Sequence, residues 1–225
     1  MPAWTSSVSS ERLSGRPVSA VNRWLLRRET KPLLFAGALV PFAWLLYGAI
    51  ANTLGANPAE ALIRSSGDWT LRFLCLTLAI TPLRQLTGWN ALARLRRMLG
   101  LFTFFYGVLH FLCFAWLDMG FDLRAILNDI PKRPFILVGT AALLLMLALA
   151  ATSFNRAIKT LGAKRWQALH RSVYAVALLA LLHFFWMRAG KNDFAEWSVY
   201  AAVMAVLLGW RLKRYFMKPG SHSAS

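Results

Sequence analysis

The amino-acid sequence predicts an all-α integral membrane protein, a bundle of six transmembrane helices with both termini in the cytoplasm. Hydrophobic residues make up 57% of the 225 residues, and the mean hydropathy is +0.46. Both values exceed what a soluble domain of this length shows. The third observation is that the basic residues, which give a formal net charge of +17, are unevenly distributed among the segments that connect the apolar stretches.

Six segments are long and apolar enough to cross a membrane, because a hydrocarbon core of about 30 Å needs roughly 20 mostly apolar residues in a helix. In chain order they are 33–52, 69–87, 99–117, 134–152, 168–187 and 196–213. Trp residues lie at the edges of several spans, at Trp69, Trp116, Trp186 and Trp197, as is typical of helix ends at the membrane interface. Residues 33–213 are therefore predicted to form one transmembrane domain.

Individual spans have their own markers. The first runs through Pro41 without a small-residue cleavage site, so it is expected to remain as a helix and not to be removed as a signal peptide. The second carries Arg72 and Arg84 near its ends, from where long side chains reach the interface. The third and fifth begin near Met98 and Ala168, where basic connections give way to apolar residues.

The charge distribution predicts the orientation. We group four segments as one face: an arm 1–32, the connections 84–97 and 156–171, and the tail from Arg211. Together they hold 19 of the 26 Lys and Arg, and their only acidic residues are Glu11 and Glu29. Lys and Arg accumulate in cytoplasmic loops. We therefore expect a flexible basic cytoplasmic arm over 1–32, a cytoplasmic tail over 214–225, and external loops near 53–68, 118–133 and 188–195. Because the basic residues are spread over short loops, anionic membrane lipid is the expected counter-charge, and no nucleic acid is expected as a partner.

Three histidines, His110, His170 and His183, lie inside or at the ends of these spans. An ionisable side chain in a membrane span indicates a functional site, and imidazole is a standard axial ligand of haem iron. Counted from the cytoplasmic ends of their helices, His110 lies roughly 18 Å deep and His183 roughly 22 Å deep. The two are therefore a plausible axial pair for one b-type haem in the outer half of the membrane.

His170 lies about 20 Å below His183 along the helix, near the cytoplasmic surface. A second haem there lacks an obvious partner, because the corresponding depth on the third span is occupied by Arg96 and Arg97. Those arginines suit haem propionates or a phosphate. Thirteen residues also leave His170 and His183 roughly 140° apart around an ideal helix.

Other interpretations of these residues stay open. Each histidine can instead donate a hydrogen bond between helices or relay protons, which would make the protein a small transporter without haem. The aromatic cluster Phe102, Phe104, Phe105 and Tyr106 can line a porphyrin pocket or simply pack in the core.

Three stretches together resemble a known family: GDWTLRFLCLTLAITPLRQL (67–86), RRMLGLFTFFYGVLHF (96–111) and WQALHRSVYAVALLALLHFFW (166–186). The sequence is similar to the MsrQ family, formerly YedZ, from about Lys31 to Arg214. These are the haem-binding membrane subunits of the bacterial methionine sulfoxide reductase system, within the ferric-reductase-like transmembrane group that includes NADPH oxidases.

The resemblance implies a bacterial inner-membrane protein that takes electrons on the cytoplasmic side, from the quinone pool or a cytosolic flavin reductase. It implies that they pass to MsrP, a periplasmic molybdopterin enzyme that repairs oxidised methionines. It also implies that His110, His170 and His183 match haem ligands, and that FMN is a cofactor.

Oxidase relatives carry two histidines on each of two helices, and this chain has no inner one on the third span. The count of one or two haems stays open, with an unusual ligand or a flavin near Arg96 and Arg97 as the inner redox centre. A quinol-oxidising cytochrome b or a ferric reductase with another acceptor is the alternative function. Substrate reduction itself is expected on the partner subunit, and no Gly-rich dinucleotide fingerprint is present.

Overall fold

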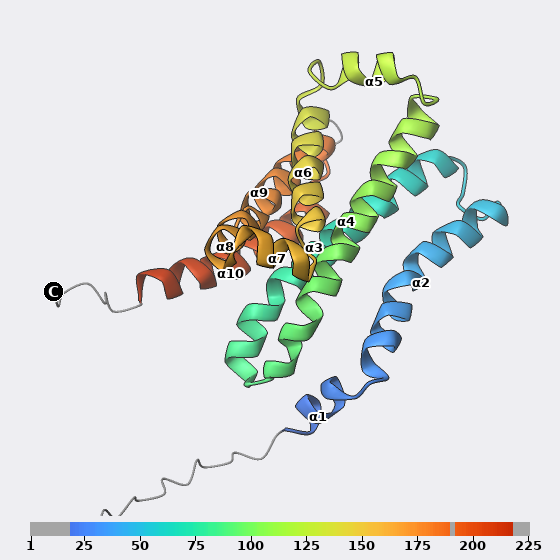
Figure 1. Ribbon diagram of the computed structural model, residues 1–225. Helices are drawn as coiled ribbons and strands as arrows, with labels where there is room; N and C mark the ends of the chain where they lie inside the picture. The colour runs from blue at the N-terminus through green and yellow to red at the C-terminus, as the bar shows by residue number, and fades with distance from the viewer. Residues whose placement is uncertain (1–18, 190–191, 218–225) are drawn as a thin grey trace, which may run out of the picture.

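A computed structural model of the protein describes residues 19–189 and 192–217, and this part of the chain is helical, with no strand. The elements are α1 (Ala20–Leu26), α2 (Thr30–Ile50), α3 (Pro58–Thr87), the 3₁₀ helix η1 (Asn90–Leu95), α4 (Arg96–Cys113), the π-helical segment η2 (Phe114–Asp118), α5 (Leu123–Asp129), α6 (Pro134–Ala151), α7 (Asn155–Leu161), α8 (Ala163–His170), α9 (Val173–Ala189) and α10 (Ala195–Phe216). Figure 1 shows α5 across one end of the bundle, with α1, α7 and α8 toward the other. The predicted all-α class is confirmed.

Local signals explain where the long helices begin and end. The side chain of Asn57 accepts a hydrogen bond from the Glu60 N–H, and Pro58 occupies the first turn, so α3 starts there. The same helix ends at Gly88, whose φ of 72° is readily adopted only without a Cβ. Pro134 begins α6 in the same way as Pro58 begins α3.

Within the described residues, four helical stretches are long and apolar enough to cross a membrane: Thr30–Ile50, Asn90–Asp118, Pro134–Ala151 and Ala163–Ala189. They coincide with the first, third, fourth and fifth predicted spans. The second and sixth predicted spans lie in α3 and α10, which have 30 and 22 residues but do not belong to this most apolar set. For these two helices, and for the side on which the termini lie, the six-span topology stays a prediction.

The two ends of the chain are more helical than the predicted arm and tail suggest. Residues 20–26 of the arm form α1, and the Asn22 side chain ties it to the α3–η1 connection by donating to the Gly88 carbonyl and accepting from the Ala91 N–H. At the other end, α10 continues to Phe216. The remaining residues of the arm and tail, 1–18 and 218–225, lie outside the described residues.

The core has α3 at its centre. One buried cluster joins α3 to α4, with Phe73, Phe102 and Tyr106 among its largest members, and Phe73 stacks on Tyr106 at 5.2 Å between ring centroids. A second cluster joins α3 to α9 and α10 through Leu74, Val176 and other apolar residues. Because α3 contacts both halves, it holds α4 and α9 in fixed positions relative to each other.

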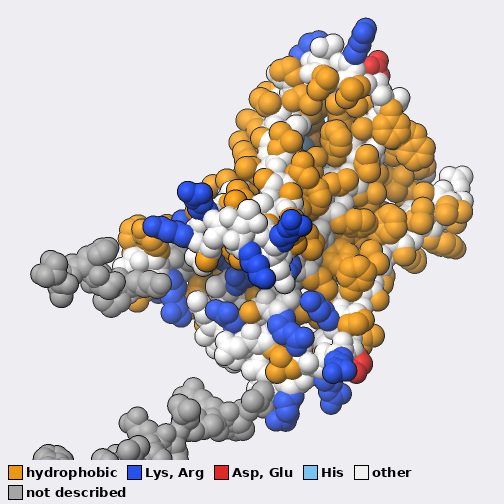
Figure 2. All heavy atoms as spheres, viewed as in Figure 1, with side chains coloured by type: hydrophobic (Ala, Val, Ile, Leu, Met, Phe, Trp, Pro, Cys, Tyr) orange, Lys and Arg blue, Asp and Glu red, His pale blue; other side chains and the backbone are white. Residues whose placement is uncertain are grey.

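The outer surface is apolar over much of the bundle. Side chains such as Trp44, Ile50 and Val206 are at least 70% exposed. Figure 2 shows hydrophobic side chains covering the upper part of the molecule, and Lys and Arg gathered toward the α7 and α8 end. An apolar surface of this extent is typical of contact with lipid.

Candidate functional site

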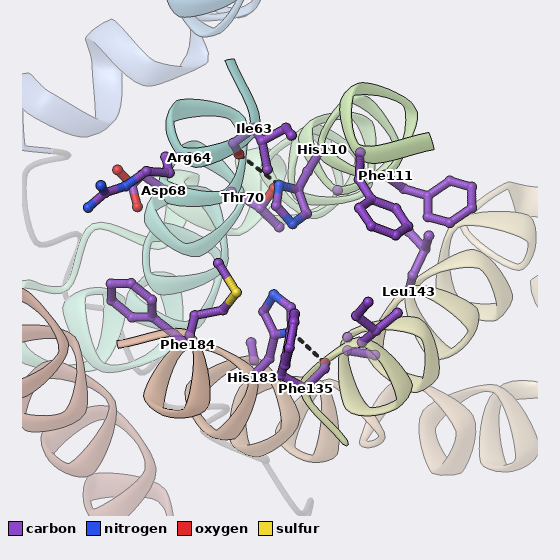
Figure 3. A pocket seen from close by; sticks show the side chains of 18 of the residues that line it. Ile63, Arg64, Asp68, Thr70, His110, Phe111, Phe135, Leu143, His183 and Phe184 are labelled. Atoms are coloured by element: carbon purple, nitrogen blue, oxygen red, sulfur yellow. Dashed lines mark hydrogen bonds between the residues drawn. The ribbon is translucent and has the colours of Figure 1, made fainter. Parts of the chain in front are cut away.

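The structure brings two of the three predicted histidines together. His110 projects from α4 and His183 from α9, and their ring centroids lie 6.0 Å apart with the ring planes at 82°. Figure 3 shows the two imidazoles approaching from opposite sides of one cavity. The matched depths inferred from the sequence correspond to this juxtaposition.

Each ring is held by one hydrogen bond to a helix backbone. The Nδ1 of His110 lies 2.8 Å from the carbonyl oxygen of Ile63 in α3, and the Nδ1 of His183 lies 2.7 Å from that of Phe135 in α6. A carbonyl oxygen only accepts, so both Nδ1 atoms carry the proton and donate it. The lone pair of each ring is therefore on Nε2, which is the state that a metal ligand requires.

The cavity between the rings has a volume of about 550 Å³. Apolar side chains form much of its wall, including Phe111, Leu143, Met146 and Phe184. Several of its charged lining residues lie at helix ends, such as Asp118 at the end of η2, Arg133 before α6 and Arg188 near the end of α9. The remaining charged lining residues, Glu60, Arg64 and Asp68, lie in the first three turns of α3. The site thus combines an apolar interior with a charged end.

All three of these cations are paired with carboxylates, Arg188 with Asp193 and Glu196. Arg64 lies 3.2 Å from Glu60, and Arg133 donates from Nε to Asp129 at 2.8 Å. The hydrogen bond that Arg133 donates to the Asp129 carboxylate raises the pKa of Arg133, so this guanidinium stays charged. Exposed or half-exposed arginines of this kind can exchange one anionic partner for another.

His170 lies elsewhere, at the N-terminal end of the fifth predicted span. Its ring stacks on Trp166 at 4.0 Å between centroids, and its Nε2 is 3.1 Å from the Thr152 hydroxyl. That hydroxyl donates to the Ala148 carbonyl, so Nε2 of His170 is the donor to Thr152. His170 therefore presents the opposite tautomer from the other two histidines. It ends α8, and a break at residues 171–172 separates it from α9 and His183.

Arg96 and Arg97, at the start of α4, bind polar side chains of neighbouring elements. Arg96 donates to the Thr81 hydroxyl at 2.7 Å, and both terminal nitrogens of Arg97 lie 3.0 Å from Asn155 Oδ1. Neither residue is paired with a carboxylate in the described part of the chain. Both therefore keep their full positive charge available to an anionic group at this end of the bundle.

The aromatic cluster of the third predicted span serves packing. Phe102 and Tyr106 are buried in the α3–α4 core, and Phe105 meets Phe42 edge to face at 5.5 Å. Phe102, Phe104, Phe105 and Tyr106 are not among the described residues that line the histidine cavity. Phe102 and Tyr106 pack against α2 and α3, so for these rings the structure favours the packing interpretation.

Sequence reasoning missed the groups that orient the histidines, which are the carbonyls of Ile63 and Phe135 and the glycines one turn further on, Gly67 and Gly139. A Cβ on Gly67 would lie 3.2 Å from the His110 ring, and one on Gly139 would lie 2.8 Å from the His183 ring. Backbone carbonyls have no sequence signature. The signal available in the sequence was the similar spacing from Gly67 to His110 and from Gly139 to His183.

The chain belongs to the class of ferric-reductase-type transmembrane proteins. Residues 66–181 match the family model described as ferric reductase like transmembrane component. The matched segment runs from within α3 to α9 and contains His110 and His170, and it ends two residues before His183.

Comparison with curated relatives narrows the class to one family. Three similar proteins carry the name protein-methionine-sulfoxide reductase heme-binding subunit MsrQ. That of Polaromonas naphthalenivorans is 63% identical over 196 residues (87% of this chain, 90% of the relative), and that of Bordetella pertussis 58% over 192 residues (85% and 92%). That of Rhodospirillum rubrum is 48% identical over 181 residues (80% and 85%). The chain belongs to the MsrQ family. No solved structure shows a significant match to it.

Proposed function

We propose that this protein is the haem-binding, electron-transferring membrane subunit of a methionine sulfoxide reductase system, and that His110 and His183 are the axial ligands of one b-type haem. The observation that carries the proposal is the pair of imidazoles facing each other across one cavity, each with Nδ1 bonded to a carbonyl. The names of the relatives, which describe haem-binding subunits, agree with it.

The residues present fit a haem. An imidazole nitrogen lies about 2 Å from the metal it binds, so two rings that share one ion have centroids on the order of 6 Å apart. The observed centroid separation is 6.0 Å. The walls supply apolar surface for a porphyrin, while Arg64 and Arg133 at the charged end suit its two propionates. The bound haem would supply a one-electron redox centre, and the chain would tune it through axial ligation, burial and nearby charge.

The cytoplasmic end has a different set of groups. His170 donates from Nε2 to Thr152, and its helix is separated from α9 by a break, so we assign it no partner histidine. The neighbouring cations Arg96 and Arg97 suit a phosphate. We therefore propose FMN at this end as the inner cofactor, with His170 beside it, and a single haem in the outer half.

The direction of electron flow follows from the topology that we propose, with both termini in the cytoplasm. Lys and Arg gather around the α7 and α8 end, which supports placing that end inside. The donor would then be the quinone pool or a cytosolic flavin reductase. The acceptor would be an MsrP-type periplasmic molybdopterin reductase that docks near the α5 end, where the haem cavity lies, and repairs oxidised proteins.

Absorption spectroscopy tests the haem assignment. The reduced-minus-oxidised spectrum and the haem content per chain are measured for the purified wild type, His110→Ala and His183→Ala. His222→Ala, in the segment outside the described residues, is the control. We expect the wild type to show a b-type signal at one haem per chain. This signal should be lost in His110→Ala and His183→Ala and kept in His222→Ala. Retained haem in both cavity variants would overturn the ligand assignment, and a colourless, folded wild type would favour proton relay.

A second experiment tests the acceptor. The protein, reduced and purified, is mixed with an MsrP-type reductase and a methionine sulfoxide substrate, and haem reoxidation is followed. We expect the haem to be reoxidised only when both the reductase and the methionine sulfoxide substrate are present. Reoxidation by ferric chelates alone would instead assign the chain to a ferric reductase.

A further inference from the structure

We propose that Gly67 and Gly139 are positioning residues for the two haem-facing imidazoles, and that the absence of a side chain at each glycine lets the ring reach the carbonyl one turn earlier. The inference rests on the proposed ligand role of His110 and His183. It adds residues of α3 and α6, two helices that contribute no histidine to the site.

The first observation is a close approach at both positions. An added Cβ at Gly139 would lie 2.8 Å from Nδ1 and 2.9 Å from Cε1 of His183, closer than non-bonded carbon atoms normally come. At Gly67, the added Cβ would lie 3.2 Å from both Cε1 and Nδ1 of His110. In each case all three nearest atoms belong to the imidazole.

The second observation is that the two halves of the site repeat one local geometry. Ile63 is four residues before Gly67, and Phe135 is four residues before Gly139. In an α-helix the carbonyl of residue i accepts from the N–H of residue i+4, so each accepting carbonyl is the one that faces its own glycine. The histidine donates to a further lone pair of that oxygen, and the ring lies over the glycine, where a methyl group would stand.

This geometry controls the ligand. A bond from Nδ1–H to a carbonyl fixes the tautomer, sets the ring rotation and raises the basicity of Nε2. A methyl group at Gly139 would force the His183 ring away from α6 and lengthen the bond to Phe135. At Gly67 the displacement of His110 would be a few tenths of an ångström. The effect should therefore be larger for Gly139→Ala than for Gly67→Ala.

Close helix packing does not account for these glycines. Glycine in membrane helices often allows two backbones to approach. At Gly107 the added Cβ would meet side-chain atoms of Met146, Leu143 and Thr70, so this glycine makes room for side chains of neighbouring helices. Gly37 and Gly209 have open space at the Cβ position and also lie in long helices, α2 and α10. These two are matched controls for the general cost of Gly→Ala in this bundle.

The test uses the purified holoprotein of Gly139→Ala, Gly67→Ala, Gly37→Ala and Gly209→Ala. Three quantities are measured: the rate of haem loss to excess apomyoglobin, the midpoint potential, and the low-temperature EPR g-values of the oxidised haem, which report the orientation of the axial rings. We expect haem binding to weaken on the order of 10- to 100-fold in Gly139→Ala, with altered g-values, and less in Gly67→Ala. The two controls should match the wild type.

Unchanged g-values and haem loss in both Gly67→Ala and Gly139→Ala would overturn the inference. If Gly139→Ala does not accumulate, Gly67→Ala decides the question. Its added Cβ would lie 3.2 Å from the His110 ring, a less severe contact than the 2.8 Å at Gly139. Failure of the ligand assignment is distinguishable, since His110→Ala and His183→Ala would then retain haem. If those variants lose haem and the glycine variants behave as wild type, only the positioning role is wrong.

Discussion

The Tyr106 hydroxyl bridges two backbone groups of a neighbouring helix, and its removal should destabilise the fold without changing the histidine cavity. Tyr106 is fully buried in α4; its hydroxyl donates to the Ala38 carbonyl at 2.8 Å and accepts from the Phe42 N–H at 3.1 Å. In a regular helix that N–H would bond to that carbonyl directly. Pro41, which lacks an N–H and tends to kink helices, lies between these two groups in α2.

The magnitude follows from the two backbone groups that Tyr106→Phe leaves behind. A buried polar group without a partner costs about 1–3 kcal/mol. If α2 straightens and restores its own bond, the loss falls toward the ~0.6 kcal/mol that is the average for side-chain hydrogen bonds in membrane proteins. The ring itself and its stacking on Phe73 are unchanged. We expect the free energy of unfolding to fall by about 1–3 kcal/mol.

Unfolding in mixed micelles over a range of SDS concentrations measures this change. Tyr47→Phe is the control, because Tyr47 is 60% exposed and its hydroxyl has no hydrogen bond within the described residues. Haem per chain should stay at the wild-type level in both variants, since neither residue lines the cavity. Equal stability of Tyr106→Phe and Tyr47→Phe would refute the bridging role of the hydroxyl.

Three further outcomes are expected. Arg188→Met should lower the free energy of unfolding by about 1–3 kcal/mol in the same SDS assay. The substitution removes a buried cation from its partly solvated carboxylate partners, which include Glu196. Wild-type stability would contradict this expectation. His170→Ala should keep the b-type spectrum and one haem per chain, since this ring lies outside the cavity; loss of haem would assign it a ligand role. The double variant Arg96→Gln/Arg97→Gln should keep haem and lose FMN, measured by fluorescence of acid-released flavin; unchanged FMN would remove these arginines from the flavin site.

Much of the architecture was predictable because membrane helices obey a one-dimensional rule. A segment must be long and apolar to cross hydrocarbon, and four of the six predicted spans coincide with helical stretches that meet this requirement. The predicted span 134–152 begins at the first residue of α6, where Pro134 starts the helix, and ends one residue after the last residue of α6. By contrast, α3 begins at Pro58, well before the predicted residue 69, since its first turns carry charged residues at the bundle end.

The candidate site was partly predictable. The pairing of His110 with His183 followed from depth alone, because a helix rises by a constant distance per residue. The aromatic cluster stayed undecided at the level of sequence, since the density of aromatic residues does not tell what each ring contacts. Phe102 and Tyr106 pack in the core formed with α2 and α3 and do not line the cavity, whereas His110, one turn after Tyr106, does.

Alone, the sequence determined the membrane class, the basic asymmetry of its connections and the level at which two histidines lie, since hydropathy, charge and helical rise are properties of the chain taken in order. The tertiary structure decided which atoms face the cavity. The carbonyls of Ile63 and Phe135 select the tautomers of His110 and His183, and a donor's partner on another helix is set by packing. Packing also gave His170 a hydroxyl partner, Thr152, because the break after α8 turns that ring toward α6.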